Sequence, residues 1–212
     1  LNEGAGGVFI STNGAINAGG DGIHGEITDV NNTKDVVLSS NNNITAGDDG
    51  IEGKTAGLGG VKIDYATNVT VDTKLVAGDI GLFANITNSG NTKDAVVKVG
   101  ETGGQKVEID ATTVGVKAAT LGSGDAIITI ADNVTIDPDD IGLDASSALG
   151  EATVLTGAND TLIIDDNEVA GSDDIDLVLL DDGANLTRHD RVHHLGEHLA
   201  VELIVLGRRL DR

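Results

Sequence analysis

The 212-residue sequence contains no cysteine, methionine or tryptophan, a single proline, one tyrosine and two phenylalanines. The absence of cysteine excludes a disulfide scaffold and a thiolate metal site, and it is compatible with export to an oxidising compartment. The scarcity of large side chains argues against an ordinary globular core. No apolar run approaches the ~20 residues that a membrane-spanning helix requires. Glycine, in contrast, is abundant, with 30 residues.

Positive charge is also scarce, since the net charge at pH 7 is −22. Residues 1–187 contain 8 lysines against 31 acidic residues, a net charge of −23, whereas all five arginines and four of the five histidines lie in residues 188–212. So acidic a surface repels phosphate groups, and we expect neither nucleic acid nor an anionic membrane as a partner. The sequence opens without a signal peptide, so we expect a mature piece or a fragment if the protein is exported.

A short phrase recurs five times along the chain. Each copy has two aliphatic residues seven positions apart and a glycine directly before the second one. The glycines of the five copies are Gly22, Gly50, Gly81, Gly115 and Gly142. A small residue follows two positions after most of the aliphatic ones, which is the period of a strand with one face inside. We therefore expect two short strands joined by a Gly/Asp-rich corner, in which the glycine has a positive φ.

A third short strand precedes each phrase. These strands cover residues 8–10, 36–38, 61–63, 97–99 and 128–130. Between this strand and the phrase lie Asn13, Asn41 and Asn133, with Asp72 and Lys106 in the other two copies. Because asparagine tolerates the left-handed conformation, we expect corners that stack and hydrogen-bond from side chain to side chain. Three strands per repeat predict a three-sided coil.

Strands this short cannot bury a face alone and must stack on those of the next coil. The sequence thus predicts an all-β, right-handed parallel β-helix of about five to seven coils. Its two expected inward ladders are Ile16, Ile44, Leu75, Ile109, Ile136 and Ile23, Ile51, Leu82, Val116, Leu143. Residues 1–187 form the repeat domain, with regular repeats over 6–156 and irregular acidic coils over 157–187. The Arg/His-rich tail, residues 188–212, is either a helical cap or a segment foreign to the fold.

The recurring phrase resembles the glycine-rich repeats in passenger regions of bacterial autotransporter-type surface proteins. The likeness is clearest in Ala46-Gly-Asp-Asp-Gly-Ile51, with residues 61–64 and 68–72 between repeats, and it spans roughly residues 6–156. This resemblance implies a β-helical passenger displayed at the outer bacterial surface. The family has no single shared catalytic motif, so the resemblance transfers no residue role.

Two motifs suggest metal binding. His194, Glu197 and His198 fit the H-x-x-E-H pattern of a zinc protease, but only Glu202 and Asp211 follow as a third ligand, and Gly196 weakens the required helix. We interpret this motif as a chance match, with adventitious Ni or Zn binding by His193, His194 and His198 as the alternative.

Residues 18–23 and 157–162 are similar to the nonapeptide of calcium β-rolls, although the period near thirty does not fit. An acid-dense stretch could hold an ion: Asp137, Asp139, Asp140, Asp165, Asp166, Glu168, Asp173, Asp174 and Asp176. We favour a solvated acidic corner over a calcium site.

Parallel β-helices also include polysaccharide lyases and glycoside hydrolases, whose catalysis often requires paired carboxylates. Residues 1–187, however, contain no arginine and no tryptophan, and only Phe9, Tyr65 and Phe83 could stack on a sugar. We therefore expect a structural or adhesive extracellular rod rather than an enzyme. It would bind a host-cell or extracellular surface component or glycan and could associate end to end. We assign no catalytic, cofactor-binding or metal-binding residue and no cofactor.

Overall fold

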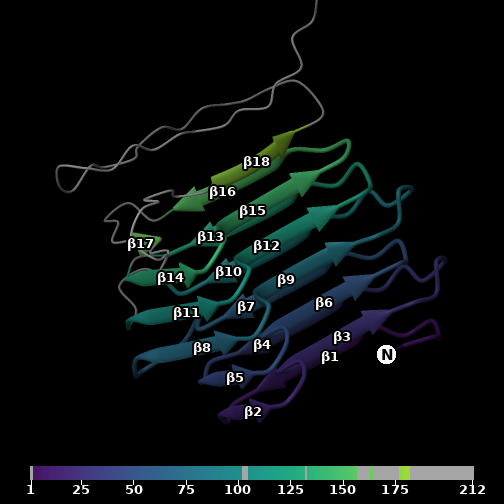
Figure 1. Ribbon diagram of the computed structural model, residues 1–212. Coiled ribbons are helices and arrows are strands. Elements are labelled where there is room, and N and C mark those ends of the chain that lie inside the picture. The colour runs from purple at the N-terminus through teal and green to yellow at the C-terminus, as the bar shows by residue number, and fades with distance from the viewer. Residues whose placement is uncertain (1, 102–104, 132, 157–162, 165–176, 182–212) are drawn as a thin grey trace, which may run out of the picture.

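The computed structural model describes residues 2–101, 105–131, 133–156, 163–164 and 177–181. Within these ranges the regular secondary structure consists of β-strands alone, arranged as three parallel sheets of six strands each (Figure 1). The parallel β-solenoid predicted from the repeats is confirmed. The expected cap or foreign segment, residues 188–212, lies outside the described residues.

Each sheet takes every third strand of the chain. Sheet I contains β1 (Val8–Thr12), β4 (Val36–Ser40), β7 (Val61–Tyr65), β10 (Ala95–Val99), β13 (Ala126–Ile130) and β16 (Ala152–Thr156). Sheet II contains β2 (Ile16–Ala18), β5 (Ile44–Ala46), β8 (Thr73–Ala77), β11 (Val107–Ala111), β14 (Val134–Pro138) and β17 (Ile163–Ile164). Sheet III contains β3 (Ile23–Ile27), β6 (Ile51–Thr55), β9 (Ile80–Ile86), β12 (Val114–Thr120), β15 (Ile141–Ser147) and β18 (Leu177–Asp181).

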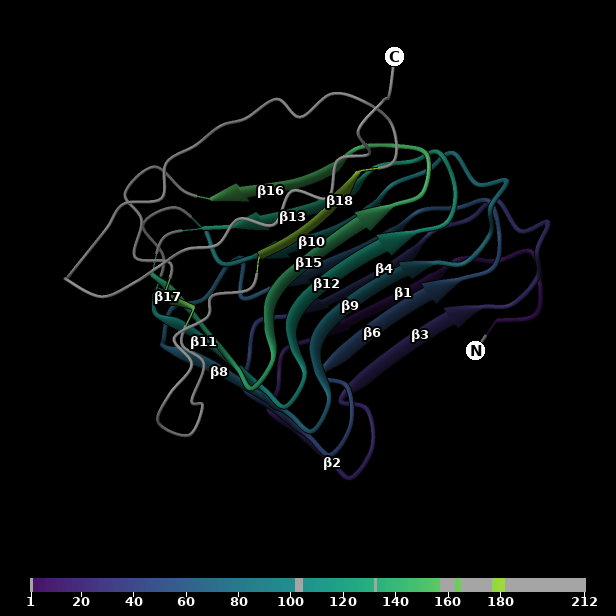
Figure 2. The ribbon, with the colours of Figure 1, turned by 45° about the horizontal axis from the view of Figure 1, so that its top comes forward.

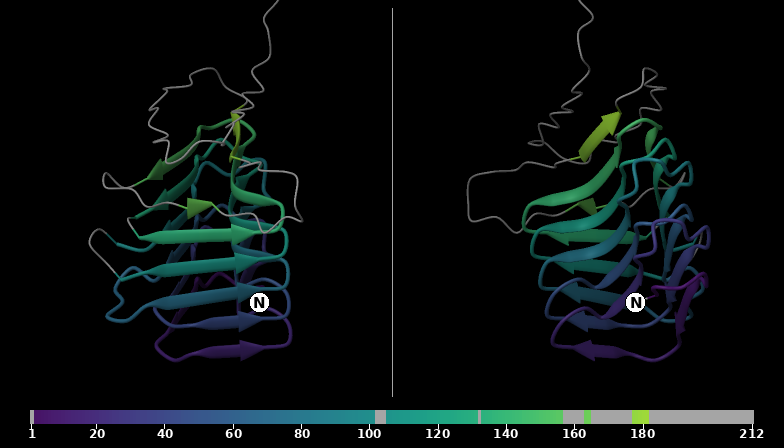
Figure 3. Two further views of the ribbon diagram at one scale, coloured as in Figure 1. Left: turned by 60° about the vertical axis from the view of Figure 1, so that its left-hand side comes forward. Right: turned by 90° about the vertical axis from the view of Figure 1, so that its right-hand side faces the viewer.

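One coil of the solenoid therefore consists of one strand from each sheet. With the C-terminal coils nearer the viewer, the chain runs counter-clockwise from sheet I through sheet II to sheet III, so the coil is right-handed (Figure 2). Equivalent strands lie above one another from the first coil to the last (Figure 3). Each strand inside a sheet thus has its main-chain partners in the preceding and following coils, and the first and last described strands of each sheet have a strand partner on one side only.

The interior is made of aliphatic ladders in the predicted register. Ile23 pairs with Ile51, Ile51 with Leu82, Leu82 with Val116, and Val116 with Leu143. The second predicted ladder, which starts at Ile16, is likewise paired residue for residue. All members are buried except Ile16, which is partly buried on the first coil. The period of two along each strand places these residues inside and their neighbours outside.

The reason predicted for the recurring glycines was wrong. Among the described glycines only Gly100 has a positive φ, of 70°. A Cβ on Gly50 would instead lie 2.4 Å from the carbonyl oxygen of Gly81 and 2.7 Å from Cδ2 of Leu75. A Cβ on Gly81 would lie 2.4 Å from the carbonyl oxygen of Gly115. The corners require glycine because successive backbones stack too closely for a side chain.

The asparagine corners also differ from expectation. Among the described non-glycine residues only Asn133 and Ala66 have a positive φ, of 61° and 54°, so the left-handed conformation holds for Asn133 but not for Asn13 or Asn41. Stacking uses main-chain donors rather than side-chain pairs alone. Asp72 Oδ1, for example, accepts a hydrogen bond of 3.1 Å from the amide of Lys106.

Two buried asparagines in the connectors from sheet III to sheet I were missed by the sequence analysis. Asn32 Nδ2 donates to the carbonyls of Gly4 and Gly6 at 2.6 and 2.8 Å. Two coils later Asn91 donates to the carbonyls of Gly57 and Gly59, at 2.8 Å each. The intervening connector is glycine-rich, since a Cβ on Gly59 would lie 1.9 Å from the carbonyl oxygen of Lys34. The connectors thus alternate with a period of two coils.

A glycine-to-alanine substitution tests the crowding at the corner. Gly50→Ala should lower the free energy of unfolding by about 2 to 3 kcal/mol, because its Cβ overlaps a main-chain oxygen that cannot move freely. Gly20→Ala is the matched control, since a Cβ there has no atom within 4 Å and the φ is not positive. Chemical denaturation should show a change below ~0.5 kcal/mol for the control. Equal effects of both substitutions would contradict the crowding.

A second comparison tests the buried asparagines. Asn32→Ala should destabilise the protein by about 2 kcal/mol, because the carbonyls of Gly4 and Gly6 and the amide of Lys34 all lose their partner. Its neighbour Asn31 is exposed, so Asn31→Ala should change stability by less than ~0.5 kcal/mol. Urea unfolding of the two variants is the measurement, and a neutral Asn32→Ala would show that the side chain does not hold the coils together.

Candidate functional site

The interior is filled by ladders, so the side chains available for chemistry lie on the outer faces and at the corners. The corner between sheets II and III carries aspartates in three successive coils. We call Asp21, Asp48, Asp49 and Asp79 the acidic corner, since they follow β2, β5 and β8 in successive coils. Carboxylate oxygens of Asp48, Asp49 and Asp79 lie within 4.8 Å of one another.

Two of these carboxylates connect successive coils. Asp49 Oδ1 accepts a hydrogen bond of 3.0 Å from the amide of Ile80, in the next coil. Asp79 Oδ1 accepts one from the hydroxyl of Thr113, again one coil further. Main-chain bonds follow the same path, as the amide of Gly78 donates to the carbonyl of Asp48 at 3.0 Å. The acidic corner therefore has a structural role in stacking the coils.

The acidic corner also holds uncompensated negative charge. The pKa of Asp49 is raised from 3.8 to about 6, chiefly by burial and also by the nearby charges of Glu52, Asp79 and Asp21, although the hydrogen bond from the amide of Ile80 lowers it. A positive neighbour would have had the opposite effect. A cation approaching this corner would therefore relieve repulsion among the carboxylates.

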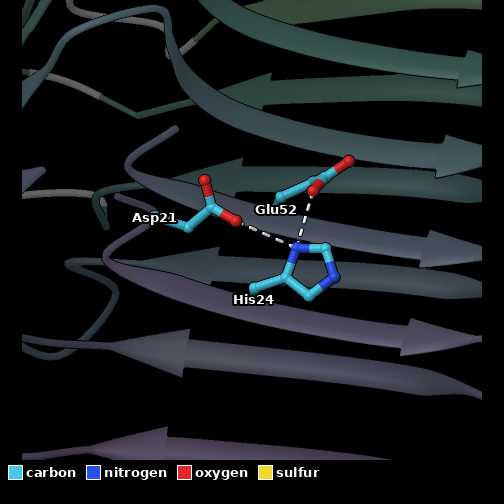
Figure 4. Close-up of side chains that lie close together, drawn as sticks. All are labelled: Asp21, His24 and Glu52. Atoms are coloured by element: carbon cyan, nitrogen blue, oxygen red, sulfur yellow. Dashed lines mark ion pairs between the residues drawn. The ribbon is translucent and has the colours of Figure 1, made fainter. Parts of the chain in front are cut away.

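His24 lies beside the acidic corner on the outer face of β3 (Figure 4). Its Nδ1 is 3.2 Å from Asp21 Oδ2 and 2.7 Å from Glu52 Oε2, and both carboxylates point toward that nitrogen. Its Nε2 is 3.8 Å from Glu26 Oε2, and Lys54 Nζ is 3.5 Å from the other oxygen of Glu26. We call Asp21, His24 and Glu52 the histidine cluster.

The register of sheet III explains this cluster. His24 pairs with Glu52, and Glu26 with Lys54, so complementary side chains are neighbours on adjacent strands. No site residue was predicted from the sequence, although Asp21 belongs to the segment resembling calcium repeats. His24 and Glu52 occupy the same position of the phrase, directly after its second aliphatic residue. Aligning the repeats residue by residue is the signal that could have found the pair.

The same outward row continues along sheet III. Lys117 Nζ is 2.6 Å from Asp144 Oδ2 and lies 5.7 Å from the centre of the Phe83 ring, a cation–π distance. The register places Phe83, Lys117 and Asp144 on successive strands. From β3 to β15 the row is therefore histidine, glutamate, phenylalanine, lysine and aspartate.

Sheet II carries a separate ionic group. Lys74 Nζ lies 2.5 Å from Glu108 Oε1 and 3.2 Å from Asp110 Oδ2, and Lys106 Nζ is 3.2 Å from Glu108 Oε2. The hydrogen bond with Glu108 raises the pKa of Lys74, and the same bond lowers the pKa of Glu108. These groups are mutually neutralised and partly exposed to solvent, so they contribute little to stability.

Sheet I presents the most apolar outer face. Its outward row includes Phe9, whose exposed fraction is 74%, with Val37, Val96 and Ile127 in equivalent positions. Lys62 interrupts this row between Val37 and Val96. A shallow hollow of about 370 Å³ lies where this face meets the connectors. Its lining residues are Thr33, Asp35, Val37, Gly60, Val61, Lys62, Lys93, Asp94 and Val96.

The metal motifs considered from the sequence fall mostly elsewhere. His193, His194, Glu197 and His198 lie outside the described residues. So do Asp165, Asp166, Glu168, Asp173, Asp174 and Asp176. Asp139 and Asp140 are exposed at a later corner between sheets II and III, where a solvated role was expected.

Comparison with family models, curated proteins and solved structures finds no significant match to this chain. The parallel β-solenoid is compatible with the repeat passenger that the sequence resembles, and family membership stays a prediction. Over the described residues the structure contains no helix able to span a membrane.

The raised pKa of Asp49 predicts that removing its carboxylate stabilises the fold at high pH but not at low pH. Between about pH 4 and pH 6 the folded protein binds more protons at Asp49 than the unfolded chain, so its contribution to stability falls as pH rises through this window. Asp49→Asn retains the acceptor for Ile80 and should stabilise the protein by about 1 kcal/mol at pH 8, with no gain at pH 4. Thermal unfolding at both pH values measures this, with Asp140→Asn, at an exposed position of a later corner, as control. A destabilised variant at pH 8 would contradict the repulsion.

Proposed function

We propose that this chain is a structural and adhesive rod of a bacterial surface protein of the autotransporter-passenger type, and that it is not an enzyme. The supporting observation is the hollow on sheet I, which is lined by an outward ladder together with connector residues. An adhesive solenoid uses this combination, because its flat faces give area and its loops give specificity.

The partner in this proposal is a host-cell or extracellular surface component or glycan. Val37 and Val96 give the sheet I face apolar contact area, while Lys62 and Lys93 supply donors at the hollow. The net charge of −22 keeps such a rod soluble and disfavours nucleic acid. The extracellular location rests on the resemblance of the repeats.

Binding to immobilised glycans and to host cells tests the proposal. The full chain should bind, and Val96→Asp combined with Lys62→Glu should reduce binding at least tenfold, since both changes alter the hollow without entering the core. Asp110→Asn on sheet II is the control and should bind like the parent. Undiminished binding by the double variant would contradict the assigned face. Release of new reducing ends from a bound glycan would show an enzyme instead.

End-to-end association is part of the same proposal. Among the described strands, β1 and β2 stand at the edges of sheets I and II, and an open parallel edge can accept another strand. Sedimentation velocity over a concentration series would detect such association. A single monomeric species at all concentrations would contradict it.

A further inference from the structure

The histidine cluster joins the first two coils through three convergent side chains. Asp21 and His24 belong to the first coil, and Glu52 comes from the equivalent strand of the second. Their ligand atoms lie within 4.8 Å of one another, and Figure 4 shows both carboxylates directed at one ring nitrogen.

The spacing of these atoms suits a metal ion. Zinc bonds to nitrogen and oxygen are about 2.0 to 2.2 Å long, so tetrahedral ligands lie roughly 3.3 Å apart. Nδ1 of His24 is 3.2 Å from Asp21 Oδ2, and its 2.7 Å distance to Glu52 Oε2 requires only a small opening. The three side chains are partly exposed, with exposed fractions of 28% for Asp21, 35% for His24 and 16% for Glu52, so the site is reachable and the glutamate can move.

The second ring nitrogen has a carboxylate of its own. Glu26 Oε2 lies 3.8 Å from Nε2, and Lys54 is close to the other oxygen of Glu26. A carboxylate on the far nitrogen is the usual partner of a metal-bound histidine, because it keeps the proton there and leaves the near nitrogen free to coordinate. At 3.8 Å Glu26 is not hydrogen-bonded to the ring, and a small rotation of its side chain would bring it into the position from which it orients the ring.

The surrounding charge favours a divalent cation. Four carboxylates lie close together here, those of Asp21, Glu26, Asp49 and Glu52. The lysine that forms an ion pair with this group is Lys54, which lies 3.5 Å from Glu26. An imidazole with two carboxylates suits zinc and other first-row transition metals, whereas calcium and magnesium prefer oxygen ligands alone.

We propose that Asp21, His24 and Glu52 bind a divalent first-row transition metal ion, with Zn²⁺ as the probe, and that the ion fastens the first coil to the second. Three protein ligands leave one position for water or for a group on a partner. This site is independent of the hollow on sheet I and of the adhesive role.

Isothermal titration of Zn²⁺ into the full chain tests the site. The tail histidines His189, His193, His194 and His198 are first replaced by asparagine, so that His24 is the remaining histidine. We expect one bound ion per chain, and binding at least tenfold weaker in His24→Gln and in Glu52→Gln. Glu26→Gln should weaken binding by about tenfold. Asp64→Asn, on sheet I, is the control and should bind like the parent.

Spectroscopy separates coordination from nonspecific charge attraction. The imidazole NMR signals of His24 should shift on addition of Zn²⁺ and stay unchanged with equimolar Ca²⁺. Lower pH should weaken binding, since protons compete for the ligands. Unaltered affinity in His24→Gln, absence of binding at millimolar Zn²⁺, or equal responses to Ca²⁺ and Zn²⁺ would each overturn the proposal. Unfolding of His24→Gln would not rescue it, because Glu52→Gln provides the same test.

Discussion

The main-chain hydrogen bonds between successive coils are the interaction on which the rest of this structure depends. They hold each strand at the usual strand spacing of about 4.8 Å from its equivalents. At that spacing the corner backbones leave no room for a side chain, as the 2.4 Å approach of a Cβ on Gly50 to the carbonyl of Gly81 illustrates. The glycine of each phrase, its position before the inward aliphatic residue and the regular register are therefore consequences of one spacing.

The same stacking decides which polar groups can lie inside. A buried polar side chain must find partners, because an unpaired buried polar group costs free energy. The buried amides of Asn32 and Asn91 each donate to two glycine carbonyls of the preceding turn of chain, and glycine in the alternating coil provides the space. The solenoid thus repeats every two coils in its connectors while its ladders repeat in every coil.

On the outside, stacking brings together residues that are about thirty positions apart in sequence. Single charges become rows, and a row is either neutralised, as at Lys74 and Glu108, or left with excess charge, as around Asp49. The histidine cluster stands between these extremes, because its ring is surrounded by carboxylates from two coils. Adhesion and metal binding would use different faces of one rod, so either could exist without the other.

The sequence by itself determined the solenoid, its three strands per coil and its inward ladders, because these follow from local periodicity and an identical phrase in each coil. Only the tertiary structure decided why Gly50 is glycine, since overlap with Gly81 depends on how coils stack rather than on the backbone angle of one residue. It also decided that Asn32 is buried while Asn31 is exposed, although both are polar connector residues. The pairing of His24 with Glu52 follows from aligning the repeats, but the approach of Asp21 to the same ring nitrogen depends on the path of the folded corner, which no local pattern specifies.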